Sequence, residues 1–209
     1  MDIIPAILAK NTEELIELQK KIGAAASLIQ VDVADGKFVP SVTVGLEEVQ
    51  RILGSYQLQI HLMVQNPEDI ISFWAAEANV ESVIVHVEAS ENVERAIGLI
   101  KSAGKSVGVA INPGTDAARL DNLLGMADFV QFMTVEPGAY GSPFVASSIG
   151  RISAFHAAHP DLLIQADGAV SPENIAQLRA AGVRHFAVGS FLVTSKNVGK
   201  AIAELQAKL

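Results

Sequence analysis

The sequence predicts a (β/α)8 barrel formed by residues 1–209 as a single domain. Three observations predict this fold. Eight short runs rich in Val, Ile and Leu recur along the chain, and amphipathic segments with helical spacing lie between them. The runs are almost continuously apolar, which is typical of parallel strands buried on both faces. The length of 209 residues suits eight strand–helix units at the lower size limit of such barrels. A doubly wound open sheet is the alternative, and eight units favour closure.

The expected strands share β-branched and apolar residues between polar or glycine-rich breaks. They lie at 3–8, 27–33, 57–64, 82–87, 106–111, 129–135, 162–167 and 185–190. A helix is expected after each strand, because apolar side chains recur every three or four residues in the intervening segments. The clearest of these helices lie at 11–22, 92–103 and 173–182.

Residues that begin and end helices agree with this division. Asn11 precedes acidic residues, as a helix N-terminus should. Pro67 and Pro172 suit the first position of a helix, where a missing N–H costs nothing. Glycines that suit helix ends are Gly23, Gly104 and Gly182.

Composition narrows the classes of protein and of site. Half of the residues are hydrophobic and 18% are charged, which provides a large core and excludes intrinsic disorder. The absence of cysteine excludes disulfides, thiolate metal sites and a cysteine nucleophile. The net charge of −8, without a run of Lys or Arg, argues against a nucleic-acid partner. No apolar run approaches the roughly 18 residues of a membrane helix. We therefore expect a cytoplasmic protein without a signal peptide that binds neither nucleic acid nor membranes.

Two aspartates are candidates for catalysis, because active sites of this fold lie at the C-terminal ends of the strands. Asp32 and Asp167 end strands that are five strands apart, so their carboxylates should face each other across the barrel mouth. Opposed carboxylates suit a reaction that removes a proton from one face of a carbon and returns one to the other. Each aspartate could instead cap the following helix. His61 and His86 are further candidates, and are equally consistent with core histidines bonded to the backbone.

Glycines follow the sixth, seventh and eighth strands, and the loops after the last two strands are the usual phosphate site of this fold. Glycine lets backbone N–H groups approach a ligand closely, although such glycines are often only turns. Met63 and Met133 also lie near strand ends, where methionine more often fills the core than a site.

A series of short motifs narrows the family to which the sequence can be compared. They are PAIL at 5–8, VDVADGKFVPSVTVG at 31–45, HLMV at 61–64, HVEA at 86–89, NPGT at 112–115, MTVEPGAYGSPF at 133–144, ADGAV at 166–170 and VGS at 188–190. In this order and spacing they resemble the ribulose-phosphate 3-epimerase family along essentially the whole chain. The resemblance implies a barrel isomerase of the pentose phosphate pathway that inverts C3 of D-ribulose 5-phosphate, giving D-xylulose 5-phosphate through an enediolate. It also implies one divalent metal ion (Zn, Fe or Mn) and a homo-oligomer.

The resemblance assigns roles by position. Asp32 and Asp167 match the acid/base pair, and together with His61 they match metal ligands. The residues that match substrate and phosphate contacts are Ala6, Met63, Met133, Gly138, Gly141, Gly168, Ala169, Gly189 and Ser190.

Several of these positions depart from the family pattern. Gln30 stands where the family has its other metal-binding histidine, and a neutral amide oxygen is a poor substitute for imidazole on zinc. Ala6 and Ala34 replace a serine and a methionine, and Ala169 replaces the second glycine of DGG. The loop usually reading GFGGQ reads GAYGS at 138–142. We therefore expect a metal ion that binds more weakly than in the family or has been lost.

Three functions remain open at this point. The leading one is a 3-epimerase of a phosphorylated ketopentose. The second is a sugar-phosphate-binding paralogue with altered specificity or without catalysis, which the departures favour. The third is a decarboxylase or aldolase of the wider phosphate-binding barrel group. Its Asp-x-Lys-x-x-Asp motif is missing, because the matching stretch reads Asp32-Val33-Ala34-Asp35 without lysine.

Overall fold

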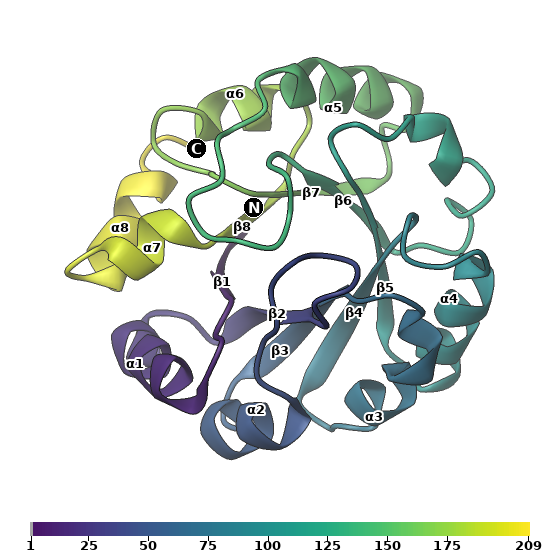
Figure 1. Cartoon of the computed structure of the whole chain (residues 1–209). Helices are drawn as coiled ribbons and strands as arrows, with labels where there is room; N and C mark the ends of the chain where they lie inside the picture. Colours follow the sequence, from purple (N-terminus) through teal and green to yellow (C-terminus); the bar gives the residue numbers. More distant parts are fainter. Residues whose placement is uncertain (1) are drawn as a thin grey trace.

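The computed structural model describes residues 2–209 and confirms the closed barrel (Figure 1). Eight parallel strands pair in chain order, and the last pairs with the first. The strands are β1 (Asp2–Ile7), β2 (Leu28–Ala34), β3 (Gln57–Met63), β4 (Val80–His86), β5 (Ser106–Ile111), β6 (Phe129–Met133), β7 (Leu163–Asp167) and β8 (His185–Val188).

Helices surround this barrel (Figure 1). The α-helices are α1 (Thr12–Ile22), α2 (Leu46–Leu53), α3 (Ile71–Ala75), α4 (Val93–Ser102), α5 (Ser147–Ala158), α6 (Ile175–Ala180), α7 (Ser190–Thr194) and α8 (Val198–Gln206). The 3₁₀ helices are η1 (Gly23–Ala25), η2 (Pro67–Asp69) and η3 (Ala117–Leu120).

Most of the predicted helix ends are confirmed. The Asn11 side chain accepts a hydrogen bond from the Glu14 N–H at the start of α1, and Pro67 begins η2. Gly23 follows α1 with a φ of 49°, a left-handed conformation that glycine adopts without strain.

Two expectations about helices were wrong. Pro172 does not begin α6, which starts at Ile175, because the Asn174 side chain accepts from the Ser171 N–H and holds the preceding residues in a turn. The segment after β5 forms only η3 and turns, not an α-helix. Asp121 and Gly125 interrupt it, and both residue types disfavour helix interiors.

The predicted ends of the sixth and eighth strands were too late. β6 ends at Met133 and β8 at Val188. Gly189 has a φ of −93° and a ψ of −90°, which turns the chain out of the sheet and into α7. The chain therefore leaves β8 two residues earlier than predicted.

The core has three clusters, one of which joins Ala34 and Met63 to Leu8 and Val39. The largest cluster lies between the outer side of the strands and the helices, and contains residues such as Ile60 of β3 and Ile97 of α4. Inside the barrel, the floor is a small apolar cluster: Ile84, Ala110 and Phe129, with Leu163 packed against it. Four buried glutamines from β2, β3, β6 and β7 form what we call the glutamine layer: Gln30, Gln59, Gln131 and Gln165. Gln131 and Gln165 follow Phe129 and Leu163 of the floor by two residues on the same strands.

Two loops lie across the open end of the barrel, one after β2 and one after β6 (Figure 1). They contact each other, because the Ser41 hydroxyl donates to the Gly138 carbonyl and the Val39 side chain packs against the Gly138 Cα. These loops enclose the carboxyl ends of the strands.

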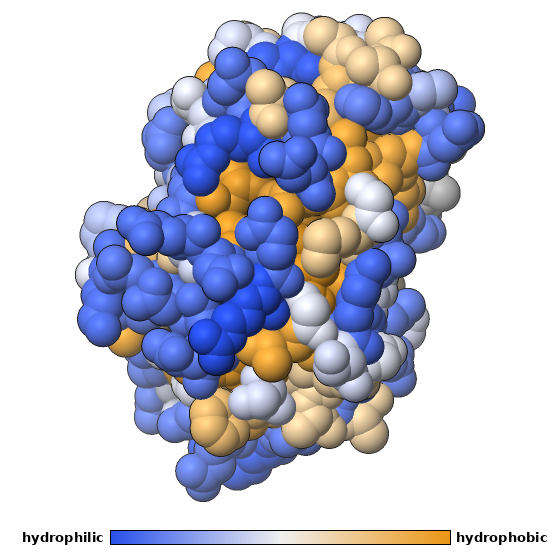
Figure 2. Space-filling model, turned by 90° about the vertical axis from the view of Figure 1, so that its right-hand side faces the viewer, coloured by the Kyte–Doolittle hydropathy of each residue, from blue (hydrophilic) through white to orange (hydrophobic). Residues whose placement is uncertain are grey.

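The outside of the molecule is not uniformly polar. The face that carries α3, α4 and η3 shows apolar residues between hydrophilic ones (Figure 2). Phe73 of α3 is 62% exposed. Among residues 2–209, none of the helices has the length and apolar character needed to span a bilayer.

Candidate active site

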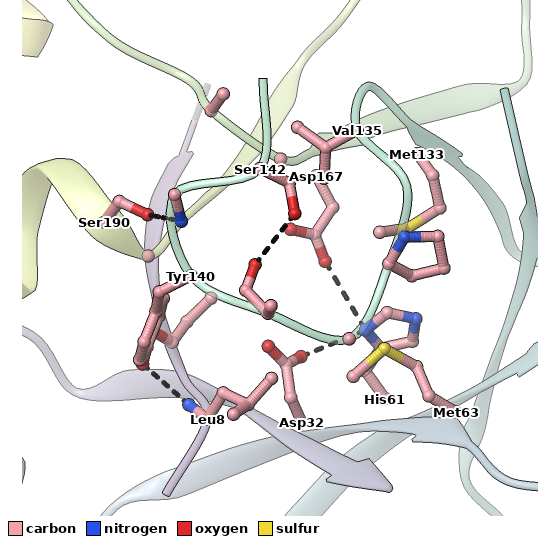
Figure 3. Close-up of a pocket in the computed structure, with 18 residues that line it drawn as sticks. Leu8, Asp32, His61, Met63, Met133, Val135, Tyr140, Ser142, Asp167 and Ser190 are labelled. Atoms are coloured by element: carbon pink, nitrogen blue, oxygen red, sulfur yellow. Dashed lines mark hydrogen bonds and ion pairs between the residues drawn. The ribbon is translucent and has the colours of Figure 1, made fainter. Parts of the chain in front are cut away.

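Strand register brings the two predicted aspartates together. Asp32 of β2 is paired with His61 of β3, and Asp167 of β7 is paired with Met133 of β6. His61 Nδ1 lies 3.0 Å from Asp32 Oδ1 and 3.4 Å from Asp167 Oδ2. Figure 3 shows the two carboxylates and the imidazole pointing toward one another. The structure therefore brings these side chains together at the barrel mouth, as expected.

Gln30 lies directly beneath this group and contacts all of it. Its amide Nε2 donates to Asp32 Oδ1 at 2.8 Å and to Asp167 Oδ2 at 2.7 Å, and lies 3.4 Å from His61 Nδ1. The amide oxygen faces the other way and accepts from Gln165 Nε2 at 2.9 Å. Gln30 thus offers N–H groups to the carboxylates and keeps its oxygen away from them.

The rest of the glutamine layer supports this arrangement. Gln131 Nε2 donates to Asp167 Oδ2 at 3.0 Å and lies 3.2 Å from His61 Nε2. Gln165 Nε2 lies 2.7 Å from the amide oxygens of both Gln59 and Gln131. Asp167 therefore accepts from two amides.

His86 of β4 extends the polar group away from the aspartates. Its Nε2 lies 2.8 Å from His61 Nε2, and its Nδ1 faces Glu88 Oε2 at 3.4 Å. The Phe38 ring packs against it, with the two ring centroids 4.9 Å apart. Both histidines are fully buried. His61 contacts the aspartates directly, and His86 lies behind it. The polar partners described for both rings are side chains, not the backbone groups expected of core histidines.

Burial controls the acidity of these side chains. It raises the pKa of Asp32 to about 7, against the hydrogen bond from Gln30, which acts to lower it. Burial, together with the charge of Asp32, raises the pKa of Asp167 to about 7. Burial also lowers the pKa of His61 and that of His86, the latter to about 4, so both imidazoles are neutral at pH 7. The aspartates are the groups that titrate near neutral pH.

A cavity above the carboxylates collects the other predicted residues. It is lined by Asp32, His61 and Asp167, and by every residue matched to substrate or phosphate: Ala6, Met63, Met133, Gly138, Gly141, Gly168, Ala169, Gly189 and Ser190. Gln30 is buried below it. The two methionines lie on the His61 side of the cavity, and Ser190 lies on the opposite side (Figure 3).

Tyr140 closes the side of the cavity that borders β1. Its hydroxyl accepts from the Leu8 N–H at 2.7 Å and donates to the Ala6 carbonyl at 3.2 Å. A Cβ on Gly189 would lie 2.8 Å from the ring of Tyr140, so only glycine leaves room for it. The remaining volume is about 50 Å³, well below the roughly 300 Å³ of a small ligand pocket. The β6 loop is therefore closed over the site.

The glycine loops present polar groups to this cavity. The Gly141 N–H donates to the Ser190 hydroxyl at 3.0 Å, which joins the loop after β6 to the start of α7. Gly168 has a φ of 117° and Ala169 a φ of 48°. Ala169 is thus a residue with a Cβ in the left-handed region, where glycine is the usual occupant.

The spacing of the three predicted metal ligands suits one metal ion. Asp32, His61 and Asp167 each offer a ligand atom, and these atoms lie within 4.8 Å of one another. The Gln30 amide does not suit a metal site. Its N–H group points at both carboxylates and takes the position that a positively charged ion would occupy. We therefore derive no step through a metal ion.

Comparison with known proteins gives the family. A model described as the ribulose-phosphate 3 epimerase family matches residues 2–193. The chain belongs to this family. It is 34% identical over 203 residues to the ribulose-phosphate 3-epimerase of Aquifex aeolicus, covering 94% of this chain and 91% of that one. It is 33% identical over 211 residues to the enzyme of the same name from Bacillus subtilis, covering 98% and 95%.

A solved structure of 3-hexulose-6-phosphate synthase superimposes with a TM-score of 0.74 over 100% of both chains. At 18% identity this likeness shows the shared barrel fold alone.

Sequence reasoning missed two glutamines of the site and the hydrogen bonds that Tyr140 makes. Gln131 and Gln165 contact the aspartates or orient Gln30, and the Tyr140 hydroxyl fastens the β6 loop to β1. One signal was available for the glutamines, since each interrupts an otherwise apolar strand two residues before a predicted site residue. A polar residue at that place in a barrel strand faces the interior.

Proposed function

We propose that this chain interconverts D-ribulose 5-phosphate and D-xylulose 5-phosphate by inverting C3. The observation that carries the proposal is the convergence of Asp32 and Asp167, from strands on opposite sides of the barrel, beneath a closed cavity. Two carboxylates on opposite sides of one carbon are what a proton exchange with inversion needs. The family membership and the names of the relatives support the same reaction.

The reaction requires one aspartate to be ionised and the other to be protonated. The ionised carboxylate takes the proton from C3, the electron pair of the C–H bond forms a C2=C3 double bond, and the π pair of the C2 carbonyl moves onto its oxygen. The protonated carboxyl then returns a proton to the opposite face of C3. The pKa values of about 7 support this division of labour, because a shared proton leaves one base and one acid near neutral pH.

Apolar walls and local donors complete the proposed site. Met63 and Met133 line the cavity beside His61 and would pack against a planar enediolate. The Gly141 N–H and the Ser190 hydroxyl bond to each other and would exchange that bond for bonds to phosphate. Local donors must attract the phosphate, because the net charge of −8 opposes it. The β6 loop must also move, since the cavity is too small for the substrate.

The test is solvent exchange at C3. Purified protein is incubated in D₂O with ribulose 5-phosphate, and NMR follows both deuterium incorporation at C3 and formation of xylulose 5-phosphate. We expect both, at rates proportional to enzyme. Absence of exchange, with and without added Zn²⁺, Mn²⁺ or Fe²⁺, overturns the proposal for this substrate. Calorimetric binding of the sugar phosphate without exchange would instead favour the non-catalytic paralogue.

A homo-oligomer is part of the same proposal. Its support is the family resemblance, and the exposed apolar residues on the face of α3, α4 and η3 are consistent with it (Figure 2). Light scattering should give a multiple of the chain mass, and a monomer mass would contradict the expectation.

A further inference from the structure

The Gln30 amide nitrogen lies among the three side chains that would hold a metal ion. It is 2.7–2.8 Å from one oxygen of Asp32 and one of Asp167, and 3.4 Å from His61 Nδ1. An amide NH₂ carries two hydrogens, which matches the two carboxylates that accept from it. The site therefore has partial positive charge, supplied by the protein, at the position between its two acids.

Gln165 holds the Gln30 amide in this orientation. Gln165 Nε2 donates to the Gln30 oxygen at 2.9 Å, and its other near neighbours are also amide oxygens, those of Gln59 and Gln131. Turning the Gln30 amide over would set N–H against N–H at this end. It would also set an oxygen against two carboxylates at the other end. Both contacts are unfavourable, so Gln30 stays a donor.

The same glutamine also orients Gln131. The Gln131 oxygen accepts from Gln165, so its N–H group faces Asp167 Oδ2 and His61 Nε2. The Gln131 amide is therefore a second donor to Asp167, and its orientation is set by the residue that sets Gln30.

We propose that the glutamine layer replaces the divalent cation in this chain, with Gln165 as the residue that orients the Gln30 and Gln131 amides as donors to Asp32 and Asp167. The inference rests on the proposed function only for its activity readout. Gln30, Gln131 and Gln165 are positioning residues, because they act through the aspartates and His61. It follows that the protein holds no tightly bound divalent cation and that Gln30 is the position that decides this.

The first experiment measures metal content. Wild type, Gln30→His and the matched control Gln57→His are each incubated with Zn²⁺, dialysed and analysed for bound metal. Gln57 is exposed at the first position of β3, so its variant adds a histidine away from the site. We expect less than about 0.1 Zn²⁺ per chain above background in wild type and the control. We expect affinity at least ~10-fold higher in Gln30→His, which restores a nitrogen ligand. One tightly held ion per wild-type chain overturns the proposal even if Gln30→His fails to fold.

The second experiment tests the orienting role of Gln165. Gln165→Met removes the N–H group that holds the Gln30 oxygen, and Gln59→Met removes only an acceptor from the same layer. The Gln30 amide in Gln165→Met can turn its oxygen toward the aspartates, so Zn²⁺ affinity should rise severalfold, with Gln59→Met unchanged. An equal effect of the two variants, or a fall in affinity in Gln165→Met, contradicts the role of Gln165.

The activity readout is chelation. We expect C3 exchange by wild type to change less than about twofold in excess EDTA, and exchange by Gln30→His to fall. Loss of wild-type exchange on chelation, with recovery on added Zn²⁺ or Mn²⁺, overturns the proposal. If wild type catalyses no exchange under any condition, the proposed function fails while the metal measurements still decide the present inference.

Discussion

The aspartate centre and the glycine loops face the same cavity but are built in different ways. The aspartate centre consists of strand side chains whose amide donors and carboxylate acceptors are joined across the barrel by the glutamine layer. The glycine loops after β6 and β7 hold backbone in left-handed conformations, and single contacts, such as that of Gly141 with Ser190, join the β6 loop to the start of α7.

The two regions also differ in how they accommodate their unusual residues. Gln30 has a consistent set of partners, because its amide nitrogen donates to the two carboxylates and its oxygen accepts from Gln165. Ala169 has a left-handed backbone with a φ of 48°, which glycine adopts without strain. Neighbouring side chains therefore satisfy the polar groups of Gln30, whereas Ala169 retains backbone strain.

The largest expected effect comes from breaking the aspartate centre. Asp32→Asn and Asp167→Asn each keep the size of the side chain and an acceptor for Gln30, but remove the group that transfers the proton. We expect each to lower kcat/KM for C3 exchange by about 10³-fold. Asp161→Asn, at an exposed position, is the control and should keep full activity. Activity above a tenth of wild type in either aspartate variant would exclude that residue as acid or base.

The aspartate centre was largely predictable, because topology alone brings strand ends together. Once eight strands close in chain order, Asp32 and Asp167 must both lie at the mouth. The orientation of Gln30 was not predictable, since it depends on the register that pairs Gln131 with Gln165 and on contacts across the barrel. The absence of an α-helix after β5 was not predicted either. Helical spacing extends through that segment, while Asp121 and Gly125 decide against the helix locally.

The next largest effect distinguishes two glycines in different loops, Gly168 after β7 and Gly114 after β5. In Gly168→Ala the new Cβ would lie 2.5–2.9 Å from the Val135 side chain and 3.0 Å from its backbone nitrogen, at a φ of 117°. Strain and overpacking together should cost about 3–5 kcal/mol of the free energy of unfolding. Gly114→Ala is the control, because nothing lies within 4 Å of its Cβ. Urea unfolding of both variants measures the difference, and equal midpoints would contradict it.

A smaller effect should appear in the pH dependence of stability. The pKa of Asp167 is about 7 in the folded chain and 3.8 in the unfolded one. Below pH 4 both states are protonated, and as the pH rises the unfolded state releases its proton first. A protonated Asp167 therefore stabilises the folded state at low pH, and this stabilisation is lost progressively as the pH rises from about 4 to about 7.

Asp167→Asn removes this dependence while leaving the other titrating groups in place. The free energy of unfolding of the variant relative to wild type should therefore increase by roughly 2–3 kcal/mol between pH 5 and pH 8. Urea unfolding of both proteins at the two pH values measures it. A difference that stays constant or falls with pH would mean that Asp167 is not held protonated by the fold.

The smallest effect tests the strain that the glycine loops retain. Ala169→Gly removes a Cβ from a residue with a φ of 48°, which should relieve about 1–2 kcal/mol. Glycine also makes the unfolded chain more flexible, which costs about 0.4–1 kcal/mol. The net expectation is a gain of ~0.5–1 kcal/mol in the free energy of unfolding. Ala26→Gly serves as the control, because Ala26 has an extended backbone with a φ of −144°, so its variant relieves no strain and carries the flexibility cost and the loss of a partly buried methyl group. The two variants should therefore shift the urea midpoint in opposite directions, and a shift of the same sign would show that Ala169 carries no strain.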